Sequence, residues 1–418
     1  MSGRGRRRAA CRPTRPARGA PTRATRCCAG PAKRGAVCEV DDEGDRAMTQ
    51  PEGTPRGGAA VAVDIARIEK ELAALWRTQS GDRALTRACS WNLIVHCQDD
   101  DVAAAAKRVA DGLVRSVPTR TILVTAHAYA TRGPELEAWV SANCHVGPGG
   151  GKLLCTEEIH LQSRGKSGVE HVPSLLRALL VPDVPTALWW AGEPPDGAAA
   201  GRLLLSGVDR LIVDTVGSAA ALSKMAHIGG LLDGLVVTDL NWLRTASLRS
   251  VLASLFDPPL GHRALFQLRR VVVQVDERGM AAARLLVAWL TSRLKWTIQQ
   301  RIPRAAGVSW RALSRDESPV TIDVEPVAAA PRDSGVHALL LEADDGARYG
   351  FVARDRGVVT TLGPPPLSRE VGAAEAPVEQ LLVAALGSRG RDRLYGVALH
   401  RAIELDQSPA SDRPVAGQ

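Results

Sequence analysis

Hydrophobic and polar positions follow two different periods along the chain, and the helical period comes first. Ile65, Ile68 and Leu72 recur at three- and four-residue spacing between charged residues, which predicts an amphipathic helix over residues 64–77. Short apolar runs then alternate with further helical patterns. The runs predict strands at residues 90–97, 120–129, 153–161, 185–190, 208–215, 234–240 and 269–275. The segments between them predict helices at residues 102–113, 134–142, 169–180, 198–205, 218–228, 242–256 and 279–295.

This alternation indicates a doubly wound α/β fold with a mostly parallel sheet, because continuously apolar strands need helices on both faces. The period changes after residue 297, where turn signals such as Asp345-Gly346 separate short runs and predict an antiparallel meander. These shorter strands are predicted at residues 320–327, 336–343, 347–354 and 357–362. A helix over residues 377–386 and a last strand over residues 394–405 complete a smaller α+β domain.

Four segments follow from these patterns. Residues 1–60 form a basic Gly/Pro/Arg-rich tail, residues 61–300 an α/β domain, residues 301–408 an α+β domain and residues 409–418 a polar tail. A chain of 418 residues has ample material for two buried cores.

The positive charge is concentrated in the tail. Residues 1–47 hold 12 Lys or Arg and 5 Asp or Glu, so they carry +7 of the total net charge of +8. They contain no aromatic, Leu or Ile residue, and we expect them to be disordered. A targeting peptide, a basic binding tail and a start codon placed too far upstream all fit. We favour the last, with the true start near Met48, which opens an ordinary polar lead-in.

The rest of the composition narrows the class of protein. A nearly neutral body does not favour nucleic acid, and no run approaches the roughly 18 apolar residues that cross a bilayer. We therefore expect a soluble, cytoplasmic protein. Cys89, Cys97, Cys144 and Cys155 lack paired spacing, so reduced thiols in apolar surroundings are expected, and the sequence does not decide whether they respond to redox state.

Motifs for reactive centres are missing. Gly165-Lys166-Ser167 follows a predicted strand, but His160 stands where a phosphate-binding loop needs glycine. The Gly-rich residues 147–152 are followed by a strand, and neither a dinucleotide fingerprint, a GxSxG elbow nor an HExxH motif occurs. Cysteine and histidine residues lack zinc spacing. We expect no catalytic residue, cofactor or metal.

Polar and aromatic residues follow several predicted strands. Trp190 and Glu193 end one strand, and Asn241, Trp242 and Arg244 end another. Ligands and partners meet parallel sheets at the carboxyl ends of strands, so these five residues are candidates for a partner interface. In the alternative interpretation, Asp239 or Asn241 caps the next helix and Trp242 fills the edge of the core.

Four stretches carry a resemblance to a known family. They are residues 179–195, 209–215, 239–257 and 285–296, which include the runs LLVPDVPTALWWAGEPP and DLNWLRTASLRSVLASLFD. Their order resembles that of the OpcA family, the glucose-6-phosphate dehydrogenase assembly proteins. The basic tail and the run SVPTRTIL at residues 116–123 depart from the family's pattern.

The resemblance implies a non-catalytic protein that binds glucose-6-phosphate dehydrogenase and favours its active oligomer in the oxidative pentose phosphate pathway. The mechanism would be linkage, because a partner that binds the active assembly more tightly shifts its population. Replacing Trp242 or Arg244 with Ala is then expected to weaken activation and to spare the fold. A metabolite effector, such as a weakly bound sugar phosphate, is left open.

Two other hypotheses remain. The first is an enzyme or sensor that binds a sugar phosphate at the same sheet edge through Lys166, Arg244 and helix N-termini. The second is nucleic-acid binding through the Arg-rich tail, which predicts an affinity that is lost when residues 1–47 are removed.

Overall fold

The computed structural model describes a set of stretches that lie between residues 65 and 410. These are residues 65–79, 85–87, 89–113, 115–130, 132–146, 153–194, 204–218, 221–257, 263–363 and 365–410. The chain divides into two units, residues 1–52 and 53–418, and every described residue belongs to the second. The predicted tail, the start near Met48 and most of the helix expected over residues 198–205 lie outside the described stretches.

The first sheet has eight strands and is parallel except for β4, which pairs antiparallel with β5. Its order is β1-β5-β3-β2-β6-β7-β8. The bounds are β1 (Leu85–Arg87), β2 (Trp91–Cys97), β3 (Thr119–His127), β4 (Leu136–Val146), β5 (Leu153–Arg164), β6 (Thr186–Trp190), β7 (Arg210–Val213) and β8 (Val236–Asp239).

Helices cover both faces of this sheet, because alternate strand residues point to opposite sides. Ile94 of β2 joins a core that includes α1, α3 and α5, whereas Leu93 and Val95 join a second core with α2 and α10. These helices are α1 (Ile65–Gln79), α2 (Asp100–Leu113), α3 (Gly165–Leu179), α5 (Ala221–Leu231) and α10 (Val378–Gly387). The predicted doubly wound, mostly parallel sheet is confirmed.

The second sheet also has eight strands, in the order β10-β11-β12-β9-β13-β14-β15-β16. Neighbours are antiparallel except for β12 and β9, so the antiparallel meander is confirmed. The bounds are β9 (Leu268–Val275), β10 (Thr297–Pro303), β11 (Val308–Leu313), β12 (Pro319–Pro326), β13 (Val336–Ala343), β14 (Arg348–Ala353), β15 (Gly357–Gly363) and β16 (Leu367–Gly372).

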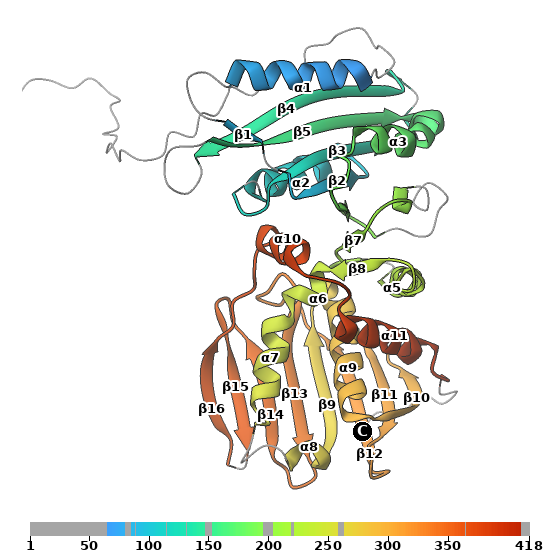
Figure 1. Ribbon diagram of the computed structural model, residues 1–418. Coiled ribbons are helices and arrows are strands. Elements are labelled where there is room, and N and C mark those ends of the chain that lie inside the picture. Colours follow the sequence, from blue (N-terminus) through green and yellow to red (C-terminus); the bar gives the residue numbers. More distant parts are fainter. Residues whose placement is uncertain are drawn as a thin grey trace, which may run out of the picture. The chain divides into compact units, whose positions relative to one another are not determined.

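Helices lie across one face of the second sheet, with α7 and α9 running along the strands (Figure 1). The helix α9 is buried along most of its length and contacts both β9 and α11. The remaining bounds are α6 (Leu240–Arg244), α7 (Ala246–Ser254), α8 (Ala264–Gln267), α9 (Met280–Leu294) and α11 (Arg393–Gln407).

Two predicted elements are of the wrong type. The helix expected over residues 134–142 is strand β4, whose alternate residues Leu136, Ala138 and Val140 pack into the core while Trp139 is 44% exposed. The strand expected over residues 394–405 is helix α11. The buried residues of α11 recur at three- and four-residue spacing, and Asp392 caps its first turn.

The strand predicted at residues 269–275 does not extend the parallel sheet. It is β9, which lies between β12 and β13 in the second sheet, so this strand and α9 pack with the second layer although they were expected in the first domain. The strands β10, β11 and β16 were not predicted. Nothing local in a strand sequence states which sheet it joins, and partners over 40 residues away decide the pairing of β9.

The expectation of reduced cysteines is wrong for Cys155, which is disulfide-bonded. In the β4–β5 ladder its register partner is Cys144, a neighbour that the mistaken helix at residues 134–142 concealed. Cys89 and Cys97 are free.

Candidate functional site

A buried polar cluster lies where β7 and β8 end. We call Asp214, Thr215, Asp239, Asn241 and Arg244 the strand-end cluster. Asp239 caps α6, since its Oδ1 accepts from the backbone N–H of Asn241 at 2.9 Å. The same carboxylate accepts from the Thr215 hydroxyl at 2.8 Å and from the Thr215 N–H at 3.2 Å.

Only one of the two polar atoms of the Asn241 side-chain amide has a hydrogen-bond partner among the described residues. Its Nδ2 donates to Thr215 Oγ1 at 3.1 Å. Its Oδ1 is buried and has no hydrogen-bond partner among the described residues, although buried polar atoms nearly always have one. This oxygen can therefore accept a hydrogen bond, either from a water molecule or from a donor that a small conformational change brings closer.

Arg244 forms a two-pronged ion pair with Asp214, at 3.0 and 2.7 Å. Its side chain is 3% exposed and that of Asp214 is 19% exposed. Burial alone would lower the pKa of Arg244, but hydrogen bonding and the charge of Asp214 raise it above its ordinary value. Arg244 thus stays charged and holds α6 against the end of β7.

Arg244 is held in its charged form, whereas the surroundings of the Asp239 carboxyl favour its neutral form. Burial is the main cause that raises its pKa from 3.8 to about 7, and the negative charge of Asp214 adds to this. The hydrogen bonds from Thr215 and Asn241 act against the rise. Asp239 therefore exchanges a proton near neutral pH inside a closed environment.

Trp242 connects the cluster to α11. Its Nε1 donates to Asp392 at 2.9 Å, and the guanidinium of Arg249 lies 3.3 Å from its ring centroid. Burial lowers the pKa of Arg249 to about 10. The ring of Tyr395 lies 5.9 Å away, and its buried hydroxyl has no partner in the described part of the chain. Burial raises the pKa of Tyr395, with Asp239 and Asp392 contributing.

The structure separates the five predicted interface residues into two groups. Asn241, Trp242 and Arg244 lie together on α6, and their exposed fractions are 0%, 2% and 4%, so none of the three has the exposed surface that a direct partner contact needs in this structure. The alternative interpretation is correct for Asp239 and Trp242, a helix cap and a core residue. The contacts with Asp392 and Arg249 explain the burial of Trp242, and neither residue was predicted from the sequence.

Trp190 and Glu193 form the second group, near the carboxyl end of β6. The Trp190 ring stacks on His96 with centroids 4.1 Å apart and is partly exposed. Glu193 accepts a hydrogen bond from the Ser218 hydroxyl at 2.7 Å. These two residues keep the accessibility that contact with a partner requires.

The residues proposed for a sugar-phosphate site do not come together. Lys166 lies on α3, directly after β5, whereas Arg244 follows β8. Four strands separate β5 from β8, and a strand spacing of about 4.8 Å places them roughly 24 Å apart. Arg244 is also bound to Asp214, so one phosphate cannot engage both cations.

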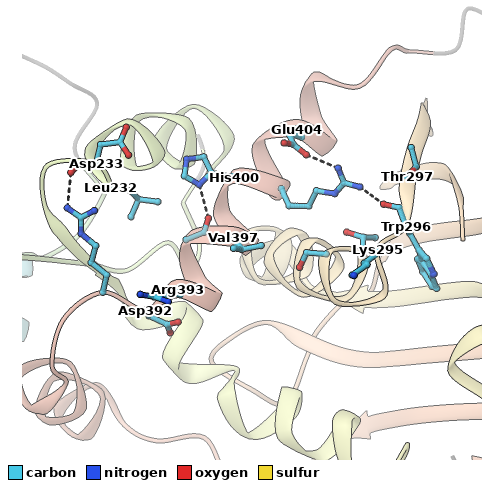
Figure 2. Close-up of a pocket in the computed structure, with 15 residues that line it drawn as sticks. Leu232, Asp233, Lys295, Trp296, Thr297, Asp392, Arg393, Val397, His400 and Glu404 are labelled. Carbon is cyan, nitrogen blue, oxygen red and sulfur yellow. Dashed lines mark hydrogen bonds and ion pairs between the residues drawn. The ribbon is translucent and has the colours of Figure 1, made fainter. Parts of the chain in front are cut away.

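A cavity of about 800 Å³ adjoins the cluster. We call it the helix-end cavity, because the end of α9, residues 393–404 of α11 and the turn after α5 line it. Figure 2 shows Val397 and His400 of α11 between Leu232 and Asp233 on one side and Lys295 on the other. Asp392 lines the cavity and also accepts a hydrogen bond from Trp242 of α6, the helix that carries Asn241 and Arg244 of the strand-end cluster.

No group of three His, Cys, Asp or Glu side chains suited to a metal ion occurs among the described residues. Within the same stretches, no helix combines the length and the apolar character that crossing a membrane needs.

These observations define a two-sheet α/β protein with a closed polar cluster at its strand ends. Two family models match the chain in order, the glucose-6-phosphate dehydrogenase subunit N-terminal domain over residues 110–229 and the C-terminal domain of the same subunit over residues 235–399. The chain belongs to this family, the OpcA proteins, as its sequence resemblance predicts.

Curated relatives share part of the chain. A protein of Nostoc punctiforme with the provisional name OxPP cycle protein OpcA is 29% identical over 195 residues, which are 46% of this chain and 41% of the relative. Its namesake from Synechocystis is 29% identical over 192 residues, 45% of this chain and 40% of the relative. The matches thus span less than half of either relative's length.

Solved structures resemble the chain in outline only. A 3-ketoreductase from Actinomadura kijaniata has a TM-score of 0.42 and 10% identity, covering 77% of this chain and 97% of its own. An NAD-binding oxidoreductase from Klebsiella pneumoniae has a TM-score of 0.43 and 10% identity, covering 77% and 96%.

Proposed function

We propose that this protein is a non-catalytic assembly factor and activator of glucose-6-phosphate dehydrogenase. One observation carries the proposal: the N-terminal and C-terminal domain models of a glucose-6-phosphate dehydrogenase subunit match consecutive parts of the chain. The strand-end cluster fits a scaffold, because its charges are bound to one another and hold α6 in place.

The mechanism is a shift in population. A protein that binds the active oligomer of the dehydrogenase more tightly than its inactive form favours the active form by the difference in binding free energy. Moving the dehydrogenase from mostly inactive to mostly active needs roughly 3 to 5 kcal/mol of such a difference. Trp190 and Glu193 are the predicted residues that remain accessible for contact.

A titration tests the proposal. The full chain is added to the purified dehydrogenase of the same organism, and glucose-6-phosphate-dependent NADP reduction is measured beside the mass of the complex by light scattering. We expect activity and mass to rise together to saturation. The proposal is wrong if micromolar concentrations of the added chain change neither the activity nor the mass of the dehydrogenase, or if the chain alone reduces NADP.

A further inference from the structure

The helix-end cavity has the size of a small-molecule site. Its volume of about 800 Å³ lies within the range of roughly 300 to 1,000 Å³ that is usual for ligand pockets. It is distinct from the strand-end cluster, and the proposed assembly function does not use it. The side chains around it therefore decide what it can bind.

Positive charge is in excess around the cavity. Its cations are Lys295, Arg391, Arg393 and Arg401, and its acids are Asp233, Asp392 and Glu404. Lys295 and Arg393 take part in no ion pair within the described stretches. Four cations against three acids leave an excess of one positive charge in the lining, and Lys295 and Arg393 are available to a ligand.

Glu404 pairs with Arg401 at 2.7 Å. Asp392 accepts from two backbone N–H groups at the start of α11 and from Trp242. Asp233 contacts Arg391 through its backbone carbonyl at 2.8 Å, and its carboxylate has no hydrogen-bond partner among the described residues. The balance favours an anionic ligand.

Further polar groups line the cavity. His400 Nδ1 lies 2.9 Å from the carbonyl of Gly396, which can only accept, so Nδ1 carries the proton and Nε2 of the neutral ring can accept a hydrogen bond from a ligand hydroxyl. Arg401 binds the carbonyl of Trp296 through Nη2, yet its buried Nε has no partner among the described residues. Such unmatched groups are typical of a site that a polar ligand completes.

The helix ends around the cavity differ in sign, since α5 and α9 end beside it and α11 begins there. The last carbonyls of α9 are occupied, since Thr291 accepts from the N–H of Trp296 and Ser292 from that of Lys295. The opposite, positive end of the 15-residue helix α11 begins at Arg393. Its dipole adds to the attraction that the cations provide.

The remaining lining suits a carbon skeleton with hydroxyl groups. Leu232 and Val397 give apolar contact, and Val397 is 55% exposed. The carboxylates of Asp233 and Glu404 can accept hydrogen bonds from hydroxyls. We infer that the helix-end cavity binds a phosphorylated sugar or polyol, whose phosphate lies between Lys295 and Arg393 and whose hydroxyls meet Asp233 and Glu404.

Calorimetry on the full chain alone tests this inference, with glucose 6-phosphate, inorganic phosphate and glucose as probes. We expect one saturable site for glucose 6-phosphate, weaker binding of inorganic phosphate and none of glucose. Arg393→Gln and Lys295→Gly should each weaken binding about tenfold or more, because each removes a charged contact with the phosphate. Lys295 has a φ of 56°, so glycine suits its backbone and the fold should keep its stability.

Lys166→Ala is the matched control, an exposed cation on α3, and it should leave the affinity unchanged. Absence of binding at millimolar glucose 6-phosphate overturns the inference, and so does unchanged binding in both cavity variants. Equal affinity for inorganic phosphate overturns the sugar part of it. Because the dehydrogenase is absent from this experiment, its outcome is independent of the proposed assembly function.

Discussion

The carboxyl group of Asp239 is enclosed on all sides, and its raised pKa makes folding depend on pH. The pKa is about 7 in the folded chain against 3.8 for the free group. Between these values the folded state holds a proton that the unfolded state has lost, so stability falls as pH rises from about 4 to about 7. The slope from this one group is at most about 1.4 kcal/mol per pH unit.

Asp239→Asn should remove this dependence, since the amide cannot ionise. We expect the variant to show a flatter profile of unfolding free energy between pH 4 and 7, measured by urea denaturation. Asp355→Asn, in an exposed turn, should keep the wild-type slope. An unchanged slope in Asp239→Asn would show that other groups set the dependence.

Arg244→Ala should lower stability rather than act only on a partner. It leaves Asp214 without its ion pair beside the buried Asp239, and breaking a largely buried pair costs about 3 kcal/mol or more. The control is Arg348→Ala, whose pair with Glu342 is exposed and should matter by under about 1 kcal/mol. Chemical denaturation of both variants measures the difference. Lost activation of the dehydrogenase with unchanged stability would instead support a direct contact.

The sequence did not predict the side-chain contacts at this scale. The residues at the ends of β6 and β8 were predicted to form one interface because parallel strands end at one edge, but the structure places them in two groups. The burial of Trp242 depends on Asp392, which is 150 residues away, and no local pattern announces that hydrogen bond.

The helix α11 depends on Asp392 at its start. This carboxylate caps the N–H groups of Leu394 and Tyr395 and also accepts from Trp242. Asp392→Ala should cost about 1 to 2 kcal/mol and should speed hydrogen exchange in the first turn of α11. Asp392→Asn keeps an acceptor for the cap and should retain most of the protection. Uniform loss across the whole chain would contradict a local role.

Elements with a clear helical period or a continuous apolar run could be predicted, and several at the margins of the sheets could not. The helices α1 and α9 and the strands β2 and β6 lie where their patterns place them. The strand β4 was mistaken because its apolar residues are small or widely spaced, and only pairing with β5 fixes its conformation. In α11, Tyr395, Val397 and Ile403 favour strand locally, but the cap and the packing on α9 override them.

At the scale of the whole molecule, the accessible Trp190 is the residue to test against the dehydrogenase. Trp190→Ala should weaken activation severalfold, because this partly exposed tryptophan lies at the strand end proposed to contact the dehydrogenase. Trp139→Ala, which removes a 44% exposed tryptophan from β4, serves as the control and should leave the activation curve unchanged. Equal effects of both replacements would indicate general destabilisation.

Family membership and fold class followed from the sequence, whereas the assignment of strands to sheets did not. The four resembling stretches lie in order along the chain, and two of them fall inside the matched C-terminal domain. The strand β9 has the continuous apolar run of a parallel strand, which its central position explains equally well in a mixed sheet.

The position of β9 also affects how the chain emerges during synthesis. Both of its neighbours are encoded later, at Pro319–Pro326 and Val336–Ala343. While the ribosome adds these residues, a nascent chain presents an apolar strand with two open edges, the arrangement most prone to intermolecular pairing. A gene truncated near residue 300 should therefore yield an insoluble product. For the full-length chain, growth at low temperature or an added chaperone should raise the soluble yield by protecting the nascent chain until β12 and β13 have been synthesised.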